Sequence, residues 1–104
     1  SGGNVQRAVL ARELSDKVSL LIAADPVFGL DFAAVAEIHE RIVQARNAGA
    51  AVLLVSGDLD ELLELSDRIV VMFEGRILLE TRTETADIAA IGQAMAGHTA
   101  KEAA

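Results

Sequence analysis

The sequence contains no cysteine, no tryptophan and no tyrosine, and it has a single proline among its 104 residues. The absence of cysteine excludes disulfide bonds and thiolate metal ligands, and it agrees with a cytosolic location. Aromatic residues make up only 3% of a composition that is 52% hydrophobic, so any core has to be aliphatic. No apolar run approaches the ~20 residues that span a bilayer, and membrane association would therefore require a partner.

Basic residues are also scarce, with nine Lys and Arg against 16 Asp and Glu and a formal net charge of −7. This balance disfavours a general role in binding nucleic acid, because clustered Lys and Arg are needed to neutralise phosphates. Two further patterns are missing, the Gly-x-Gly-x-x-Gly turn of dinucleotide sites and the arrangement of acids found in receiver domains. A small Rossmann-like or receiver-like domain is therefore disfavoured.

Helical and extended patterns alternate along the chain. We expect helices over residues 4–15, 32–48 and 59–65, and strands over residues 18–24, 51–55 and 69–73. The first two strands are continuous aliphatic runs, which are typical of parallel strands buried on both faces. The alternation predicts an α/β fold with mostly parallel strands flanked by helices.

Capping residues predict where these helices begin and end. Asp31 caps the long helix, and Gly49 stands just past its end. Asp58 and Glu61, three residues apart, form a capping-box-like start for the following helix. We expect the long helix to bury an apolar stripe made of Phe32, Val35, Ile38, Ile42 and Ala45.

A hairpin and a helix are expected toward the C-terminus. The Glu74-Gly75 turn joins the third strand to residues 76–79 as a hairpin. Thr83 or Thr85 caps a final helix that reaches about Met95.

The first candidate binding motif is Ser1, Gly2, Gly3 and Asn4, which leads directly into the first expected helix. Glycines let the backbone come close to a phosphate, and a helix N-terminus offers unpaired N–H groups and the positive end of a dipole. The Ser1 hydroxyl adds another donor. Alone, the Ser-Gly-Gly tripeptide is a weak signal. It is interpreted as a phosphate-contacting motif or, equally well, as a structural segment such as a tag remnant or a plain helix cap.

A second candidate site follows the first expected strand. Asp25 stands at its carboxyl end, where α/β proteins bind ligands, although it is also interpretable as a residue that ends the strand. Gly29, Leu30 and Asp31 come next, and Asp31 can serve both as a helix cap and as a site residue.

Two other polar features are expected to be structural. His39, alone on the long helix, is interpreted as a partly exposed structural residue rather than a metal ligand. The acidic cluster of Asp58, Asp60, Glu61 and Glu64 is expected to be a solvated helix face, because the alternating-oxygen loop of a calcium site is missing. The sequence therefore indicates no metal site.

Together these segments resemble the ATP-binding subunits of ABC importers for simple sugars and nucleosides. The resemblance lies in residues 1–7 with 10–14 and in the strand 20–24 followed by Asp25-Pro26. It continues in residues 51–56, 58–61 and 65–72 and in the turn of residues 74–77. It implies that residues 1–97 are the C-terminal half of a second cassette of the P-loop NTPase type, beginning at the signature motif. Residues 98–104 are expected to be a disordered tail.

The resemblance assigns roles to the candidate residues. Ser1, Gly2, Gly3 and Asn4 match the signature motif, which in such dimers completes the ATP site of the opposite cassette. Gly29, Leu30 and Asp31 match the D-loop.

Three positions depart from an active cassette. Ala24 replaces the Asp that holds Mg²⁺, Asp25 replaces the catalytic Glu, and Gly57 stands where the switch His would lie. The resemblance therefore implies a degenerate site of its own, with Asp25 as a weak general base.

The resemblance also implies what the intact parent binds. We expect ATP and Mg²⁺, the other cassette, and membrane-spanning permease subunits at the cytoplasmic face of the cell membrane. These 104 residues alone lack a Walker A loop, so we expect no cofactor and no ATPase activity from them. Their unpaired sheet edge invites homo-oligomers. The alternative is a non-catalytic scaffold or regulatory module that retains the cassette fold.

Overall fold

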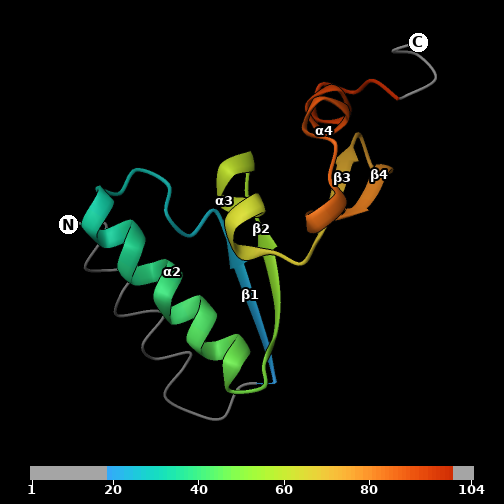
Figure 1. Ribbon diagram of the computed structural model, residues 1–104. Coiled ribbons are helices and arrows are strands. Elements are labelled where there is room, and N and C mark those ends of the chain that lie inside the picture. The colour runs from blue at the N-terminus through green and yellow to red at the C-terminus, as the bar shows by residue number, and fades with distance from the viewer. Residues whose placement is uncertain (1–18, 100–104) are drawn as a thin grey trace. The chain divides into compact units, whose positions relative to one another are not determined.

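The computed structural model describes residues 19–99, so residues 1–4 and the helix expected over residues 4–15 lie outside the described residues. The elements, shown in Figure 1, are in chain order β1 (Leu20–Ala24), α2 (Phe32–Asn47), β2 (Ala51–Val55), α3 (Leu59–Leu65), β3 (Arg68–Phe73), β4 (Arg76–Arg82), the 3-10 helix η1 (Thr83–Thr85) and α4 (Ile88–Met95). The chain divides into two compact units, Ser1–Glu61 and Leu62–Ala104, and each is described by itself.

The first unit is built on the parallel pair β1 and β2, joined through α2 (Figure 1). Leu20 pairs with Ala51 at one end of the ladder, and Ala24 pairs with Val55 at the other. Two parallel strands connected through a helix form the βαβ arrangement that the alternating pattern predicts, so the α/β fold class is confirmed.

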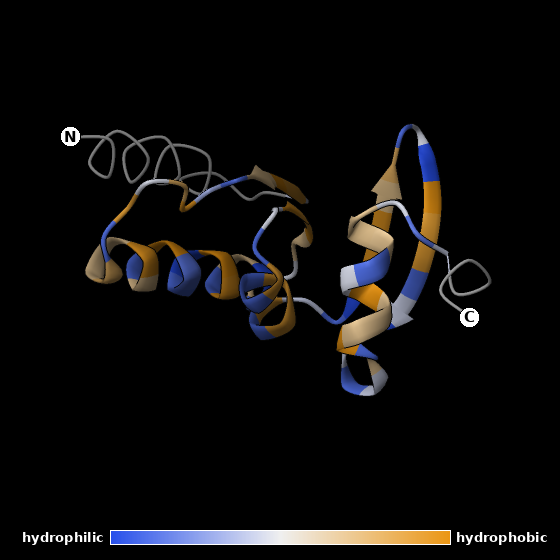
Figure 2. Ribbon diagram, turned by 90° about the horizontal axis from the view of Figure 1, so that it is seen from above, coloured by the Kyte–Doolittle hydropathy of each residue, from blue (hydrophilic) through white to orange (hydrophobic). Residues whose placement is uncertain are grey.

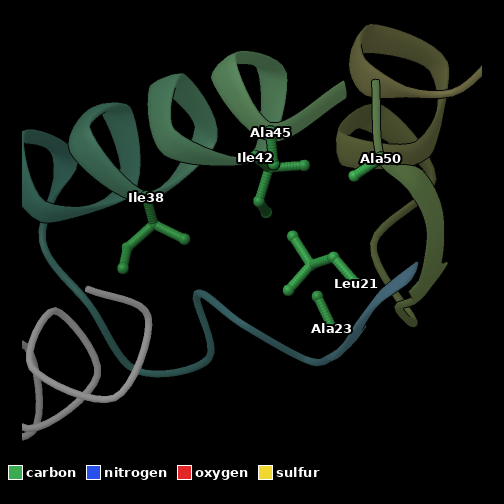
Figure 3. Close-up of a cluster of buried hydrophobic side chains, with 6 residues drawn as sticks. All are labelled: Leu21, Ala23, Ile38, Ile42, Ala45 and Ala50. Carbon is green, nitrogen blue, oxygen red and sulfur yellow. The ribbon is translucent and has the colours of Figure 1, made fainter. Parts of the chain in front are cut away.

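The core of this unit lies between α2 and one face of the strand pair. In Figure 3 the side chains of Ile38 and Ile42 on α2 and of Leu21 on β1 point toward one another, and all three are buried. Ala23, Ala45 and Ala50 complete the cluster. The small residues let helix and strand backbones approach closely, so an aliphatic core forms without an aromatic side chain.

The apolar stripe of α2 differs from the expected one at its start. Ala34, Ile38, Ile42 and Ala45 are buried, whereas Phe32 is 96% exposed. At about 100° per residue, Phe32 lies roughly 120° around the helix from Ile38, so it points away from the strands. The expectation of a buried Phe32 was therefore wrong, and Figure 2 shows hydrophobic and hydrophilic residues alternating along this helix.

The opposite face of the strand pair is apolar and exposed. Leu20, Ile22, Leu53 and Val55 are between 51% and 61% exposed, and Ile22 and Leu53 are register partners. We call these four residues the open sheet face. The expectation that both strands are buried on both faces was therefore wrong for residues 19–99. Helix α2 covers one face, and the open sheet face is exposed to solvent.

The second unit begins with the antiparallel hairpin of β3 and β4. Glu74 and Gly75 form its turn with φ values of 48° and 79°, and two successive residues with positive φ are the mark of the tight turns that suit hairpins. The hairpin is confirmed, and β4 is longer than expected because it continues to Arg82. The register shifts between Val71 and Met72, which places a bulge in the ladder.

Helix α4 packs against β3 and buries Ile91 and Ala94, while Ile69 and Val71 are the buried residues of β3. The expected caps of this helix were wrong. Thr83 and Thr85 form η1 instead, after which Ala86 is extended and Asp87 becomes the N-cap. The Asp87 carboxylate accepts a hydrogen bond from the backbone N–H of Ala90 at 3.2 Å, the usual stabilisation of a helix start.

The two glycines of the α4 region should respond in opposite ways to alanine. Gly97 has φ +91°, and a Cβ there would lie 2.8 Å from the Phe73 ring, so Gly97→Ala should destabilise the chain by about 1–3 kcal/mol. Gly92 lies inside α4 in open space, and Gly92→Ala should stabilise it by about 0.5–1 kcal/mol. Urea unfolding followed by circular dichroism measures both. Equal shifts of the same sign would contradict the described packing.

Neighbouring residues of β1 should differ in the same assay. Leu21 is buried against α2, so Leu21→Ala should lower the free energy of unfolding by about 2–5 kcal/mol. Ile22 belongs to the open sheet face, and Ile22→Ala should cost less than about 1 kcal/mol. A large cost at Ile22 would show that this face is covered in solution.

Candidate functional site

The candidate site lies at the carboxyl edge of the strand pair. The backbone N–H of Asp25 donates to the carbonyl of Val55 at 2.7 Å, and Ala24 is the register partner of Val55. The ends of β1 and β2 are therefore held side by side. Asp25 and residues 56–58 consequently leave the sheet at the same edge, where α/β folds bind their ligands.

Residues 25–31 form a compact loop after β1. Asp25 has φ +44°, a left-handed conformation that Asp tolerates better than most residues, and Gly29 has φ +76°. The carbonyl of Asp25 accepts from the N–H of Phe28 at 3.3 Å, and the carbonyl of Val27 accepts from Leu30 at 3.1 Å. These bonds turn the chain from the strand into the start of α2.

Asp31 ends this loop and begins α2. Its carboxylate accepts a hydrogen bond from the backbone N–H of Ala34 at 2.9 Å, so the expected N-cap is confirmed. On either side of the turn, Phe28 and Phe32 are 84% and 96% exposed. Phe28 in the loop and Phe32 at the start of α2 therefore place two large apolar side chains at the surface.

The strand end itself offers few groups for metal chemistry. Ala24 is exposed and contributes no side-chain oxygen, which leaves the Asp25 carboxylate as the acid at this end of β1. Within residues 19–99, no three acidic, His or Cys side chains are grouped so that they could hold a metal ion.

Residues 56–58 connect β2 to α3. The Ser56 hydroxyl accepts from the N–H of Asp58 at 3.0 Å. The Asp58 carboxylate accepts from the N–H groups of Asp60 at 3.0 Å and Glu61 at 3.3 Å, so Asp58 caps α3 as expected. Gly57 is exposed, its φ is outside the left-handed region, and a Cβ there would meet open space. The backbone therefore does not require glycine at this position.

Two expectations about this loop need correction, and both concern Glu61. It does not reach back to the Asp58 N–H, which Ser56 already satisfies, so the capping box is only half formed. Glu61 is also 3% exposed and not part of a solvated face. Its Oε2 lies 2.6 Å from Nε2 of His39 on α2, which makes His39 a structural partner of Glu61. Sequence reasoning missed this pair because its residues lie 22 positions apart and no local pattern joins them.

The remaining sequence-based candidates, Ser1, Gly2, Gly3 and Asn4, lie outside the described residues. The structure therefore brings together Ala24, Asp25 and Gly57 at one edge, with the Gly29–Asp31 segment beside it in the same loop as Asp25. No helix within residues 19–99 is long and apolar enough to cross a membrane.

Comparison with solved structures identifies the fold. The ATP-binding cassette MJ1267 of an ABC transporter superposes with a TM-score of 0.72 at 24% identity, over 92% of this chain and 36% of that chain. At this identity the likeness concerns the fold, and the fold is that of part of an ATP-binding cassette.

Sequence comparison defines the relatives more closely. The chain is 47% identical over 103 residues to the guanosine import ATP-binding protein NupO of Bacillus subtilis, covering 99% of this chain and 20% of the relative. It is 47% identical over 97 residues to the glucose import ATP-binding protein TsgD13 of Haloferax volcanii, covering 93% of this chain and 18% of the relative. No protein-family model matches the sequence.

The chain thus spans about a fifth of the length of the curated relatives it matches. By sequence and by fold, it corresponds to a segment of the ATP-binding subunits of sugar and nucleoside ABC importers.

The open surroundings of Gly57 generate a prediction about the site. Gly57→His should leave the free energy of unfolding within about 1 kcal/mol of the original, because neither space nor φ opposes a side chain. Gly29→His is the matched control, since its φ of +76° should make the same change cost about 1–2 kcal/mol. Urea unfolding of both variants provides the comparison. Equal destabilisation would show that residues 56–58 have a different backbone from the one described.

Proposed function

We propose that this chain is the C-terminal half of the second cassette in the ATP-binding subunit of an importer for a sugar or a nucleoside. The observation that carries the proposal is the 47% identity to the guanosine import ATP-binding protein NupO over 103 residues. This range takes in the residues that match the signature motif, the end of β1 and the loop after β2. In this proposal Ser1, Gly2, Gly3 and Asn4 complete the ATP site of the opposite cassette. Glycine backbone and a helix N-terminus are suited to that contact with phosphate.

The cassette's own site would be catalytically weak. Mg²⁺ is bound by oxygen ligands, and Ala24 has none in its side chain. A general base must lie within hydrogen-bond reach of the attacking water, and the Asp25 carboxylate is one methylene shorter than the Glu of an active cassette. Gly57 cannot contact a γ-phosphate through a side chain. These three residues share one edge of the strand pair, which supports a single degenerate site.

The intact parent would hold ATP and Mg²⁺ at the site completed by this signature, where the metal neutralises developing phosphate charge. The Gly29–Asp31 segment would face the other cassette, and the neighbouring Phe28 and Phe32 would make that contact more apolar. Permease subunits would hold the protein at the cytoplasmic face of the membrane. When the chain is alone, the strand edges that are unpaired within residues 19–99 and the open sheet face favour self-association.

A second candidate function is a scaffold that retains the fold without chemistry. Ala24 and Gly57 favour it, because both lack the side chains that nucleotide hydrolysis uses. The two functions differ at Ser1, since a scaffold does not depend on that hydroxyl.

The test is a chimera in which this chain replaces its aligned segment in NupO of Bacillus subtilis, with guanosine uptake measured in cells that lack their own copy. The chimera should support uptake, and Ser1→Arg should reduce it by roughly a hundredfold, the order seen when a donor to a transition-state oxygen is removed. Gln93→Arg, on the exposed side of α4, is the matched control and should leave uptake unchanged. Full uptake with Ser1→Arg would favour the scaffold.

A further inference from the structure

Glu61 is the one charged residue that is buried within residues 19–99. Its Oε2 and Nε2 of His39 lie 2.6 Å apart and share a hydrogen bond, with side chains that are 2% and 12% exposed. The other carboxyl oxygen, Oε1, is buried and has no hydrogen-bond partner among residues 19–99. The pair therefore combines one short, shielded hydrogen bond with an unsatisfied polar atom.

Stability alone does not explain why this buried pair is present. Removing a carboxyl group from water carries a large desolvation cost, and an unpaired buried oxygen adds to it. Two apolar side chains of similar volume could fill the same space with equal or better stability. A hydrogen bond fixes both the distance and the orientation of the two side chains, whereas apolar contact does not fix their orientation.

The two residues belong to the two helices that follow the loops of the candidate site. His39 lies on α2, which begins at Asp31 after the loop that follows β1. Glu61 lies in the first turn of α3. Its N–H donates a hydrogen bond to the carboxylate of Asp58, the residue that follows Gly57. The hydrogen bond therefore joins the helix that follows one site loop to the helix that follows the other.

We propose that His39 and Glu61 are positioning residues whose hydrogen bond fixes residues 56–58 relative to the loop of residues 25–31. The two loops then form one preorganised edge, and its Gly29–Asp31 segment faces the other cassette. This inference rests on the function proposed above, because that function places Gly29–Asp31 against the other cassette. Neither residue is placed in contact with nucleotide.

The first test measures hydrogen exchange in the full 104-residue chain. The measured quantity is a ratio: the protection factors of the amides at positions 60 and 61 divided by that of Ile42, an α2 residue of the same unit. H39L/E61M replaces both partners by apolar side chains. In this variant the ratio should fall about tenfold or more, while the urea midpoint stays near that of the original chain. E40M/Q44L makes a similar exchange at an exposed pair on α2 and should leave the ratio unchanged. An unchanged ratio in H39L/E61M would overturn the proposal.

A second pair of variants keeps a polar side chain at position 61, so it does not depend on the double variant folding. Glu61→Gln retains the length and an amide oxygen for the hydrogen bond, whereas Glu61→Asp retains the charge but is one methylene shorter. In the NupO chimera, E61Q should transport guanosine within about twofold of the unmodified chimera, and E61D should lose roughly tenfold or more, since a displacement of about 1 Å can cost about 10²-fold. Equal transport by both variants would overturn the proposal.

The two readouts separate this inference from the proposed function. If the unsubstituted chimera folds but transports no guanosine, the proposed function is contradicted. The exchange ratio in the 104-residue chain still decides in that case whether His39 and Glu61 position the loop.

Discussion

The parallel pairing of β1 with β2 beneath α2 is the constraint on which the first unit depends. Ile38 and Ile42 hold the helix on one face of the strands, and the ladder ends where the N–H of Asp25 meets the carbonyl of Val55. Because both strands run in the same direction, the loops that follow them share an edge. Without that pairing, Ala24 and Gly57 would be distant features of the sequence instead of neighbours at one site.

Local chemistry explains which parts of the fold were predictable. Asp31 as a cap and the Glu74-Gly75 turn depend on residues a few positions apart, and both are confirmed. The cap of α4 was misplaced because Thr83, Thr85 and Asp87 are all competent caps, and the extended conformation of Ala86 decides among them. Phe32 was misjudged because its hydrophobicity, and not its angle around the helix, guided the expectation.

The site was predictable only in part, for a related reason. Asp25 could be placed at a strand end from the apolar run before it, and the structure joins that end to Val55. The contact of His39 with Glu61 depends on how α2 and α3 lie in the folded unit, and an acidic residue among other acids gives no local sign of burial. Roles at the nucleotide came from the resemblance to known importers, since no residue pattern in this chain alone specifies a partner cassette.

The open sheet face has a thermodynamic consequence for whatever covers it. Leu20, Ile22, Leu53 and Val55 carry no charge, so their association would gain its free energy from released water and would show a negative heat-capacity change. Such a contact weakens on cooling and strengthens with salts that are excluded from protein surfaces, although the chain as a whole carries a net charge of −7. Assembly of two copies at this face would therefore weaken in the cold, and salt would favour it further by screening the repulsion between two chains of net charge −7.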